Sequence, residues 1–248
     1  MVAVVALVLY IYSVRENHMN TSKLAESDKD FPVQIVPIEH ATAVLRWGDT
    51  VIYTDPTGGA EAFAGQPQAG MVLVTDIHGD HLDADTLGAV IGDAVLVVPQ
   101  AVKEQLPETF ASRARVLRNG ESLSEAGLTV TAVPMYNLPE SPDAFHTKGR
   151  GNGYVLERDG IRVYVAGDTA GIPEMRALED IDIALVPMNL PYTMDVKEAA
   201  DAVLAFAPRT VYPYHYRGKD GLSDINRFKE LVNAGNPDIH VVFAEWYP

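Results

Sequence analysis

Cysteine is absent from this sequence of 248 residues, which excludes disulfide bonds and any metal site built on thiolate ligands. Basic residues are scarce as well: 19 Lys and Arg stand against 34 Asp and Glu, and the formal net charge is -15 at pH 7. So acidic a chain is a poor candidate for sequence-independent binding to nucleic acid or to anionic lipid. A phosphorylated substrate stays open, because a bound metal ion can invert the local field.

The sequence also lacks an apolar run of the ~20 residues that span a bilayer. Residues 2–12 are apolar but shorter than this, with no basic residue before them and no small-residue cleavage site after them. We therefore expect residues 1–32 to form a tail, apolar and then polar, with translation starting at Met1 or at Met19. A cytoplasmic protein is the expectation, and weak membrane association through residues 2–12 is the alternative.

The rest of the chain has the composition of a globular protein, with 47% hydrophobic and 21% charged residues overall, and we predict one α/β domain over residues 33–248. Runs rich in Val and Ile between turn residues predict strands, and apolar residues at helical spacing predict helices. Strands are expected at residues 33–38, 43–47, 50–54, 71–74, 94–99, 128–133, 153–157, 161–165, 181–188, 210–216 and 240–244. Helices are expected at residues 85–91, 101–106, 172–178, 196–206 and 222–232.

A dense cluster of metal-ligand side chains, DIHGDH at residues 76–81, follows the predicted strand at 71–74. His78, Asp80 and His81 are good ligands for a divalent cation at neutral pH. A short turn containing Gly79 can direct Asp76 and His78 towards one metal position. It can direct the next pair, at residues 80 and 81, towards a neighbouring one. Helix capping is the alternative, but it explains only the carboxylates that follow the cluster and not two His beside Asp80.

Further candidates stand where other predicted strands end. Asp168 follows the strand at 161–165, and His215 emerges at the end of the strand at 210–216. A carboxylate delivered at a strand end and preceded by Gly is well placed to bridge two metal ions. The long loop at 135–153 is a candidate wall of an active site, because it is too long for a simple hairpin.

The stretch at 76–81 resembles the HxHxDH signature of the metallo-β-lactamase superfamily of metal-dependent hydrolases, with Asp76 in place of the first His. Residues 167–169 (GDT) resemble the superfamily's motif for a bridging Asp. The resemblance implies a four-layer αβ/βα sandwich, the metallo-β-lactamase fold, over residues 33–248. Within the superfamily, the chain most resembles the compact single-domain branch that includes ascorbate-6-phosphate lactonase-like proteins and N-acyl-phosphatidylethanolamine phospholipase D.

The resemblance also implies two neighbouring metal positions. One would take Asp80, His81, Asp168 and His215. The other would take Asp76, His78, the bridging Asp168 and a His after the strand at 128–133, where this chain has Asn137. Asn is a poor ligand, so either His146, further along the same loop, replaces it or His146 binds substrate; we slightly favour the first.

Two more residues are implied to support the site without ligating. Asp55 matches the superfamily's first acidic motif, Asp-Pro after a strand, and would support the metal loop; an Asx-turn explains it equally well. His40, before the second strand, can approach the site from the same edge or serve as a turn residue.

The expected chemistry is hydrolysis of an ester, lactone or phosphodiester bond in a small molecule by a metal-activated hydroxide, with one or two zinc ions, or manganese or iron. Asp80 would orient the hydroxide or shuttle its proton. Asn137, Lys148 and Tyr192 are candidates for binding substrate, although surface or packing roles explain Lys148 and Tyr192 as well. The competing function is a non-catalytic or redox, iron-binding protein on the same fold. A homo-oligomer is left open.

Overall fold

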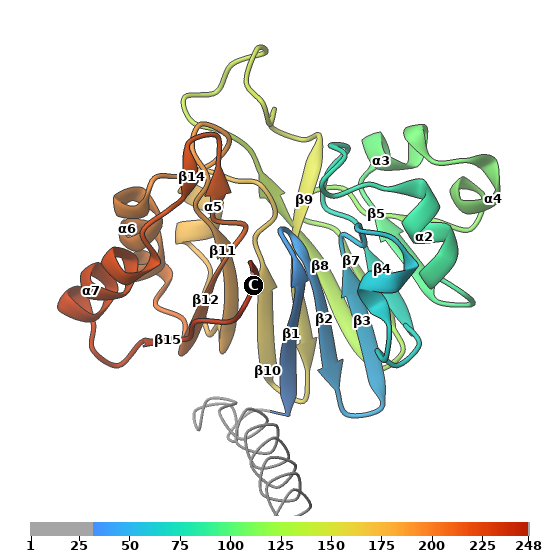
Figure 1. Cartoon of the computed structure of the whole chain (residues 1–248), viewed down its shortest axis with the longest axis horizontal. Coiled ribbons are helices and arrows are strands. Elements are labelled where there is room, and N and C mark those ends of the chain that lie inside the picture. Colours follow the sequence, from blue (N-terminus) through green and yellow to red (C-terminus); the bar gives the residue numbers. More distant parts are fainter. Residues whose placement is uncertain (1–31, 248) are drawn as a thin grey trace, which may run out of the picture.

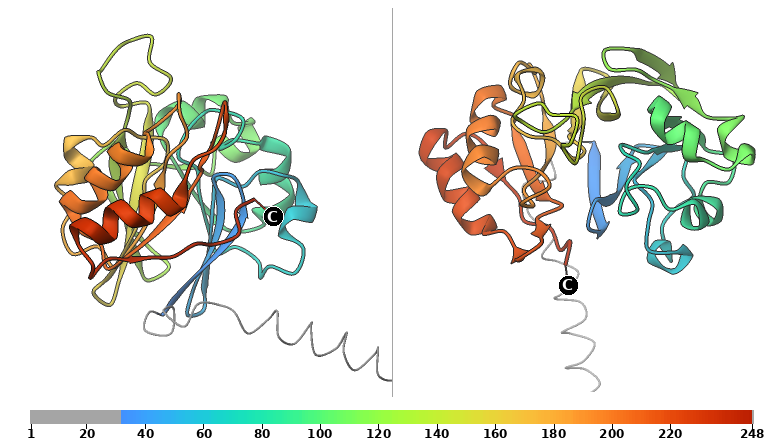
Figure 2. Two further views of the ribbon diagram at one scale, coloured as in Figure 1. Left: turned by 60° about the vertical axis from the view of Figure 1, so that its left-hand side comes forward. Right: turned by 90° about the horizontal axis from the view of Figure 1, so that it is seen from above.

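The computed structural model describes residues 32–247, so the expectations for the tail, including a start at Met19 and membrane association through residues 2–12, lie outside the described residues. Two β-sheets lie face to face at the centre, and helices cover the outer face of each (Figures 1 and 2). This is the four-layer α/β arrangement that the sequence predicts. Within the described residues, no helix is both long and apolar enough to cross a membrane.

The first sheet has six strands in the order β1-β2-β3-β4-β5-β6. They are β1 (Val33–Glu39), β2 (Thr42–Trp47), β3 (Thr50–Thr54), β4 (Met71–Leu73), β5 (Val95–Val98) and β6 (Arg115–Val116). Strands β1 to β3 form an antiparallel meander, and β3 to β6 run parallel. The outer face is covered by η2 (Ala60–Phe63), α2 (Ala84–Val90), α3 (Gln100–Gln105) and α4 (Glu108–Ala111) (Figure 1).

The second sheet has seven strands in the order β15-β12-β11-β10-β9-β8-β7. They are β7 (Ser122–Glu125), β8 (Leu128–Met135), β9 (Gly151–Arg158), β10 (Ile161–Val165), β11 (Ile183–Pro187), β12 (Thr210–Tyr214) and β15 (His240–Val241). Strands β7 to β10 are antiparallel, whereas β10, β11, β12 and β15 are parallel. Its helices are α5 (Pro173–Arg176), α6 (Val196–Phe206) and α7 (Ile225–Gly235), and a small hairpin joins β13 (Arg217–Gly218) to β14 (Gly221–Leu222).

Both faces of the first sheet are buried, which explains why its central strands read as continuous apolar runs. Met71 and Leu73 of β4 belong to the core between the sheets, where Val130 of β8 also packs. Val72, one residue out of phase, belongs instead to the core beneath the helices. The alternation of a strand thus divides β4 between two cores.

One predicted helix is misplaced. The sequence analysis starts the last helix at residue 222, but α7 begins at Ile225, and Leu222 lies in β14. Asp224 decides the start, because its carboxylate accepts a hydrogen bond from the backbone N–H of Arg227 at 2.9 Å and so caps the first turn.

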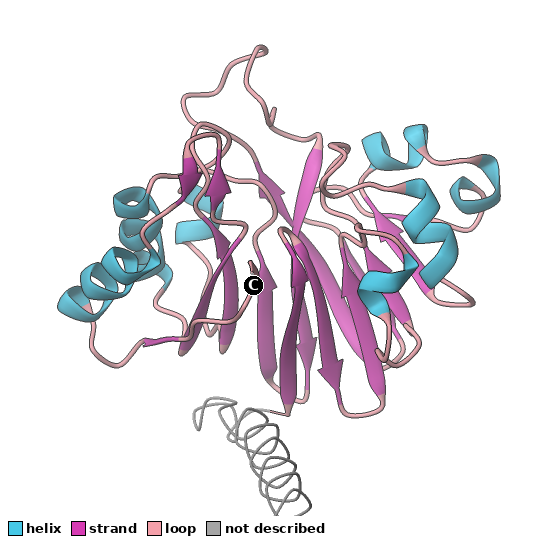
Figure 3. Cartoon of the chain, in the orientation of Figure 1, coloured by secondary structure: helices cyan, strands magenta, loops and turns pink. Residues whose placement is uncertain are grey.

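The other predicted elements lie within two residues of their bounds, except the last strand, which ends at Val241 (Figure 3). Several elements have no counterpart in the prediction, namely η2, α4, β6, β7 and the hairpin β13–β14. Strand β7 is exposed or half-buried along its whole length and largely polar, so it carries no hydrophobic signal.

Candidate metal centre

Five chain segments bring polar side chains to one end of the two sheets. They are the loops after β3, β4, β10 and β12, and the long connection between β8 and β9. Most of these loops leave the carboxyl ends of parallel strands, which is where α/β folds place their ligands. The residues singled out in the sequence meet there in an inner and an outer group, and His40 forms a third set with Asp80 and His215 beside the inner group.

The inner group consists of His81, Asp168 and His215, all buried. His81 Nε2 lies 3.4 Å from Asp168 Oδ2, and His215 Nε2 lies 3.2 Å from Asp168 Oδ1. Asp80 stands beside them, with its carboxylate oxygens 3.4 Å from His215 Nε2 and 3.9 Å from His81 Nε2. The four residues predicted for one metal position are therefore together.

The outer group consists of Asp76, His78 and His146. Asp76 Oδ2 is 2.7 Å from His78 Nδ1 and 3.6 Å from His146 Nε2. His146 Nε2 also lies 3.3 Å from Asp168 Oδ2, so Asp168 stands between the two groups. Of the two alternatives for the third ligand, the structure brings His146, rather than Asn137, to the group.

Asn137 has a different task in this structure. Its Oδ1 accepts the backbone N–H of His146 at 2.8 Å, and its Nδ2 donates to the carbonyl of Tyr192 at 2.8 Å. His146 Nδ1 lies 3.2 Å from the same carbonyl. Asn137 thus holds His146 in place, and its predicted part in binding substrate stays untested.

Four buried atoms at the centre have no hydrogen-bond partner among the described residues. They are Nε2 of His81, His146 and His215, and Oδ1 of Asp168. Buried polar atoms are almost always hydrogen-bonded, so a convergent set of unpartnered ones needs an explanation. Imidazole nitrogen and carboxylate oxygen are ligands of zinc, manganese and iron, and these residues fit a metal ion.

Asp55 orients the inner group from behind. One of its oxygens lies 2.8 Å from His81 Nδ1, and the other accepts the backbone N–H of Thr75 at 2.7 Å. With Nδ1 engaged by a carboxylate, the ring of His81 presents Nε2 to the centre, which is the usual support of a metal-binding His. Nδ1 of His215 has a different neighbour, the side-chain amide nitrogen of Asn189 at 3.2 Å, which can donate a hydrogen bond to it.

Asp168 stays ionised despite its depth. Burial disfavours the charged form, but the charges of His215 and His81 and the nearby ring of His146 hold its pKa well below the ordinary value. Its loop depends on Gly167, whose φ of +65° is a conformation that side chains disfavour.

Arg150 makes a contact that the sequence analysis does not anticipate. Its Nε donates to Asp76 Oδ1 at 3.1 Å and its Nη2 to Asp76 Oδ2 at 3.0 Å, so both oxygens of a fully buried carboxylate are engaged. Burial disfavours the charge on Asp76, but the hydrogen bond from His78 and the charges of His81 and Arg150 lower its pKa to about 2. In the sequence, only the unexpected acid at position 76 hints at such a partner.

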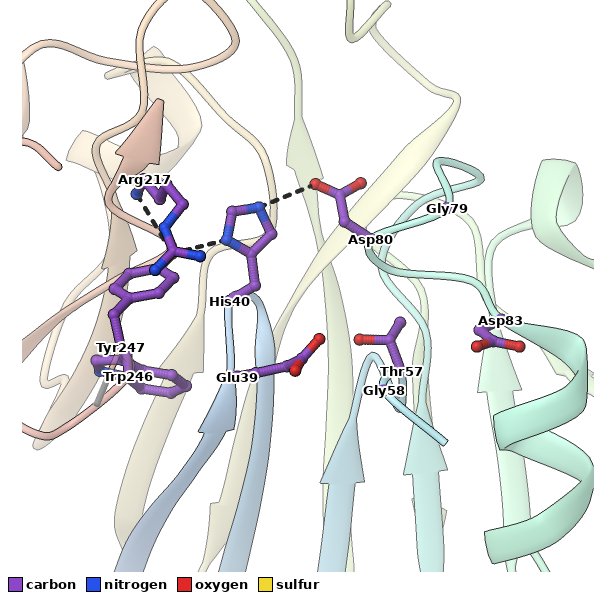
Figure 4. A pocket seen from close by; sticks show the side chains of 10 residues that line it. All are labelled: Glu39, His40, Thr57, Gly58, Gly79, Asp80, Asp83, Arg217, Trp246 and Tyr247. Atoms are coloured by element: carbon purple, nitrogen blue, oxygen red, sulfur yellow. Dashed lines mark hydrogen bonds and ion pairs between the residues drawn. The ribbon is translucent and has the colours of Figure 1, made fainter. Parts of the chain in front are cut away.

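His40 lies at the rim of the centre. Its Nε2 is 3.4 Å from Asp80 Oδ2, and its Nδ1 is 2.7 Å from the hydroxyl of Tyr247 (Figure 4). Its ring centre is 4.0 Å from that of His215. The structure therefore places His40 against the inner group, which is one of the two alternatives that the sequence leaves open for it.

Two cavities open onto the centre. One, of about 320 Å³, is lined by His78, Asp80, His146 and Asp168 together with Phe145, Tyr192 and Arg217. A wider one of about 610 Å³ shares His40, Asp80 and Arg217 with the first and extends to Trp246 and Tyr247 (Figure 4). Sequence reasoning misses Arg217, whose guanidinium stacks 4.2 Å above the ring of Tyr247.

Lys148 lies outside the residues that line either cavity. Its ammonium group is 2.9 Å from Glu174 and 4.5 Å above the ring of Tyr136. The structure thus gives Lys148 partners other than a substrate, whereas Tyr192 lines the cavity beside the metal ligands.

Comparisons with known proteins agree with this geometry. The family profile described as Beta-lactamase superfamily domain matches residues 34–215. A UPF0173 metal-dependent hydrolase of Pyrococcus abyssi is 33% identical over 212 residues, which cover 81% of this chain and 92% of the relative. The solved structure of a proposed metal-dependent hydrolase from Parabacteroides distasonis gives a TM-score of 0.76 at 37% identity and covers 87% of this chain and 94% of that one.

A more distant structure shows the fold alone. Igni18, a metallo hydrolase from Ignicoccus hospitalis, gives a TM-score of 0.72 at 22% identity and covers 86% of this chain and 94% of its own. The two mixed sheets between helices are thus the metallo-β-lactamase fold. Because the family profile spans most of the chain and the relatives match over most of both lengths, the chain belongs to the metallo-β-lactamase superfamily and, within it, to the UPF0173 family of metal-dependent hydrolases.

Proposed function

We propose that the protein hydrolyses an ester, lactone or phosphodiester bond in a small molecule, with one or two zinc ions, or manganese or iron, held by the inner and outer groups. The observation that carries the proposal is the convergence of four buried, unpartnered ligand atoms from His81, His146, Asp168 and His215. A bound dication would lower the pKa of a coordinated water towards ~7 and so supply a nucleophile at neutral pH.

The carboxylates and imidazoles of the centre have different proposed roles. Asp168 would connect the two metal positions, because its Oδ2 lies near both His81 and His146 and its Oδ1 faces His215. Asp80 is the carboxylate that opens to the cavity, with its side chain 41% exposed, so it can accept a proton from the attacking water. His40 and His215, each 3.4 Å from Asp80 Oδ2, hold that carboxylate in place.

The cavity supports a substrate with an anionic group. Arg217 lines both cavities. Its guanidinium has no carboxylate partner among the described residues, although the formal net charge of the chain is -15. An arginine in this state suits a phosphate or carboxylate. Phe145 and Tyr192, with ring centres 5.1 Å apart, offer an apolar surface opposite. The resemblance to the branch of ascorbate-6-phosphate lactonase-like proteins also favours a phosphorylated substrate.

The experiment compares metal content and activity in the same preparations. Purified protein is expected to hold one to two metal ions per chain by plasma mass spectrometry and to cleave bis(p-nitrophenyl) phosphate or a lactone. His81→Ala removes a buried inner-group ligand and should abolish activity and lower the metal content. His240→Ala, an exposed His on β15, is the matched control and should change neither.

Two results would count against the proposal. A His81→Ala protein with its full metal content would refute the ligand assignment. A wild-type protein that binds iron and cleaves neither substrate would favour the non-catalytic or redox function instead.

A further inference from the structure

The two metal-ligand groups differ in charge. The inner group has the carboxylates of Asp168 and Asp80 facing its imidazoles, and no Lys or Arg of the described residues forms an ion pair with either carboxylate. The outer group has Asp76 as its own carboxylate, and Arg150 already holds both oxygens of that carboxylate. The carboxylates of the inner group are therefore free to bind a metal cation, whereas the carboxylate of the outer group is already paired with the positive guanidinium of Arg150.

The backbone enforces the contact between Arg150 and Asp76. The residue after Arg150 begins β9, and the N–H of Asn152 donates to the carbonyl of Thr75, the residue before Asp76, at 3.0 Å. The guanidinium of Arg150 also donates to the carbonyl of Phe145 at 2.6 Å, and its side chain is only 19% exposed. A partly buried, two-pronged pair of this kind is much firmer than a mobile ion pair on the surface.

We propose that Arg150 makes the two metal positions unequal. It competes with the metal ion for Asp76, so that the inner group fills first and the outer group holds its ion at least about tenfold more weakly. This inference rests on the metal centre of the proposed function but concerns the order and strength of loading, which that function leaves open.

The physical reason is electrostatic. A metal ion in the outer group must take Asp76 Oδ2 from Arg150 and then remain close to a positive guanidinium in a buried site, where like charges repel strongly. Together, Asp76 and Arg150 are neutral, so the acid at position 76 adds no net attraction for a cation. His78 and His146 are then the remaining ligands that the outer group does not share with the inner one.

The test is a calorimetric titration of Zn²⁺ into protein stripped with a chelator. Wild-type protein should bind one ion tightly and a second at least about tenfold more weakly. Arg150→Met removes the competing charge while keeping an apolar stem of similar length, and should tighten the second step about tenfold or more. Arg227→Met is the matched control: it breaks an exposed Arg–Glu pair of 2.8 Å, with Glu230 on α7, and should leave both steps unchanged.

A double substitution shows whether the effect passes through Asp76. In an Asp76→Asn background the second step should be lost, and adding Arg150→Met should not restore it. Arg150→Lys serves if Arg150→Met does not fold, because Lys keeps the charge but gives up the two-pronged contact; a smaller tightening than for Met is expected.

The inference is overturned if a folded Arg150→Met protein binds its second ion no more tightly than wild type, or if the Arg150→Lys protein, where only it folds, shows no tightening. The failure of this inference is distinguishable from that of the proposed function. A His81→Ala protein that keeps its metal refutes the site as a whole, whereas unchanged second-step binding in Arg150→Met refutes only the role of Arg150.

Discussion

His81 and His215 hold a proton more firmly than an exposed histidine does. Burial disfavours the charged ring of His81, yet the charges of Asp168 and Asp55 and the hydrogen bond with Asp55 raise its pKa well above 6.5. Burial likewise opposes protonation of His215, and the nearby carboxylates of Asp168 and Asp80 raise its pKa. In the metal-free protein, protons therefore occupy the nitrogen atoms that a metal ion needs.

This competition predicts how metal stabilisation depends on pH. Because the folded-state pKa of both rings lies above the unfolded value of ~6.5, their protons stabilise the metal-free fold below that pH, and this contribution is lost as the pH rises through the folded-state pKa. The difference in melting temperature between zinc-loaded and metal-free protein should therefore be larger at about pH 8.5 than at about pH 6. Differential scanning calorimetry measures both; an equal difference at the two pH values would contradict the prediction.

Individual site residues differ in how far the sequence reveals them. Asp168 and His215 could be found because each follows a strand whose apolar run is plain, so that the strand end locates the side chain. His146 could only be offered beside Asn137, since both lie on a connection whose path no periodicity describes. The role of Arg150 does not follow from the sequence for the same reason. Its partner, Asp76, is 74 positions away, and the path of the connection between β8 and β9 determines that the two side chains meet.

At the scale of elements, the start of β9 presses against the metal loop. A side chain at Gly151 would place its Cβ 2.8 Å from the backbone carbonyl oxygen of Thr75, one residue before Asp76. The Cβ would also lie 2.5 Å from Met135 Cε, and that flexible side chain can move. The Thr75 carbonyl cannot move as easily, because it is backbone and accepts the hydrogen bond from the N–H of Asn152. The join between β9 and the metal loop therefore requires glycine.

We expect Gly151→Ala to lower the free energy of unfolding by roughly 1–3 kcal/mol, as over-packing in a close-fitted interior does. Gly79→Ala, within the metal loop itself, is the matched control: its Cβ would meet nothing within 4 Å, and its backbone φ is not positive. The change there should stay within ~0.5 kcal/mol. Urea denaturation measures both variants, and equal effects would show that crowding at residue 151 is unimportant.

The elements that the sequence predicts well are those whose signal is local. Helix α6 begins after Asp195, which caps it, and carries an apolar stripe, so its bounds follow from the sequence. The start of α7 was placed too early because Leu222 continues the apolar pattern, although Asp224 is the residue that caps the helix. Gly79 lies in a turn, as the sequence predicts, although its φ is not positive and the turn does not require glycine.

At the scale of the whole molecule, the metal-ligand groups join the two sheets. His78 and His81 follow a strand of the first sheet, whereas Asp168 and His215 follow strands of the second. The order of strands and helices is compatible with the four-layer fold, and the resemblance carried by residues 76–81 and 167–169 implies it. That order did not reveal which strand ends meet, because that depends on how one sheet is placed on the other.

The two sheets are held together by the apolar core and by hydrogen bonds such as the one from the Tyr154 hydroxyl to the Val74 carbonyl, 2.9 Å long. The unpartnered polar atoms of the metal-ligand groups lie where the ends of the two sheets meet. A metal ion bound at His81, Asp168 and His215 would cross-link both sheets and stabilise only the folded chain.

Removal of the metal should therefore loosen both sheets together. A ligand at ~1,000 times its Kd contributes about 4 kcal/mol, which for a chain of this size corresponds to a shift in melting temperature of roughly 10 °C. Hydrogen exchange should show faster exchange at the ends of β4, β10 and β12 alike after chelation. His81→Ala should give the metal-free exchange pattern with or without added Zn²⁺. If chelation accelerated exchange in one sheet alone, the ion would not link the two, and the ligands assigned to the other sheet would have to be sought elsewhere.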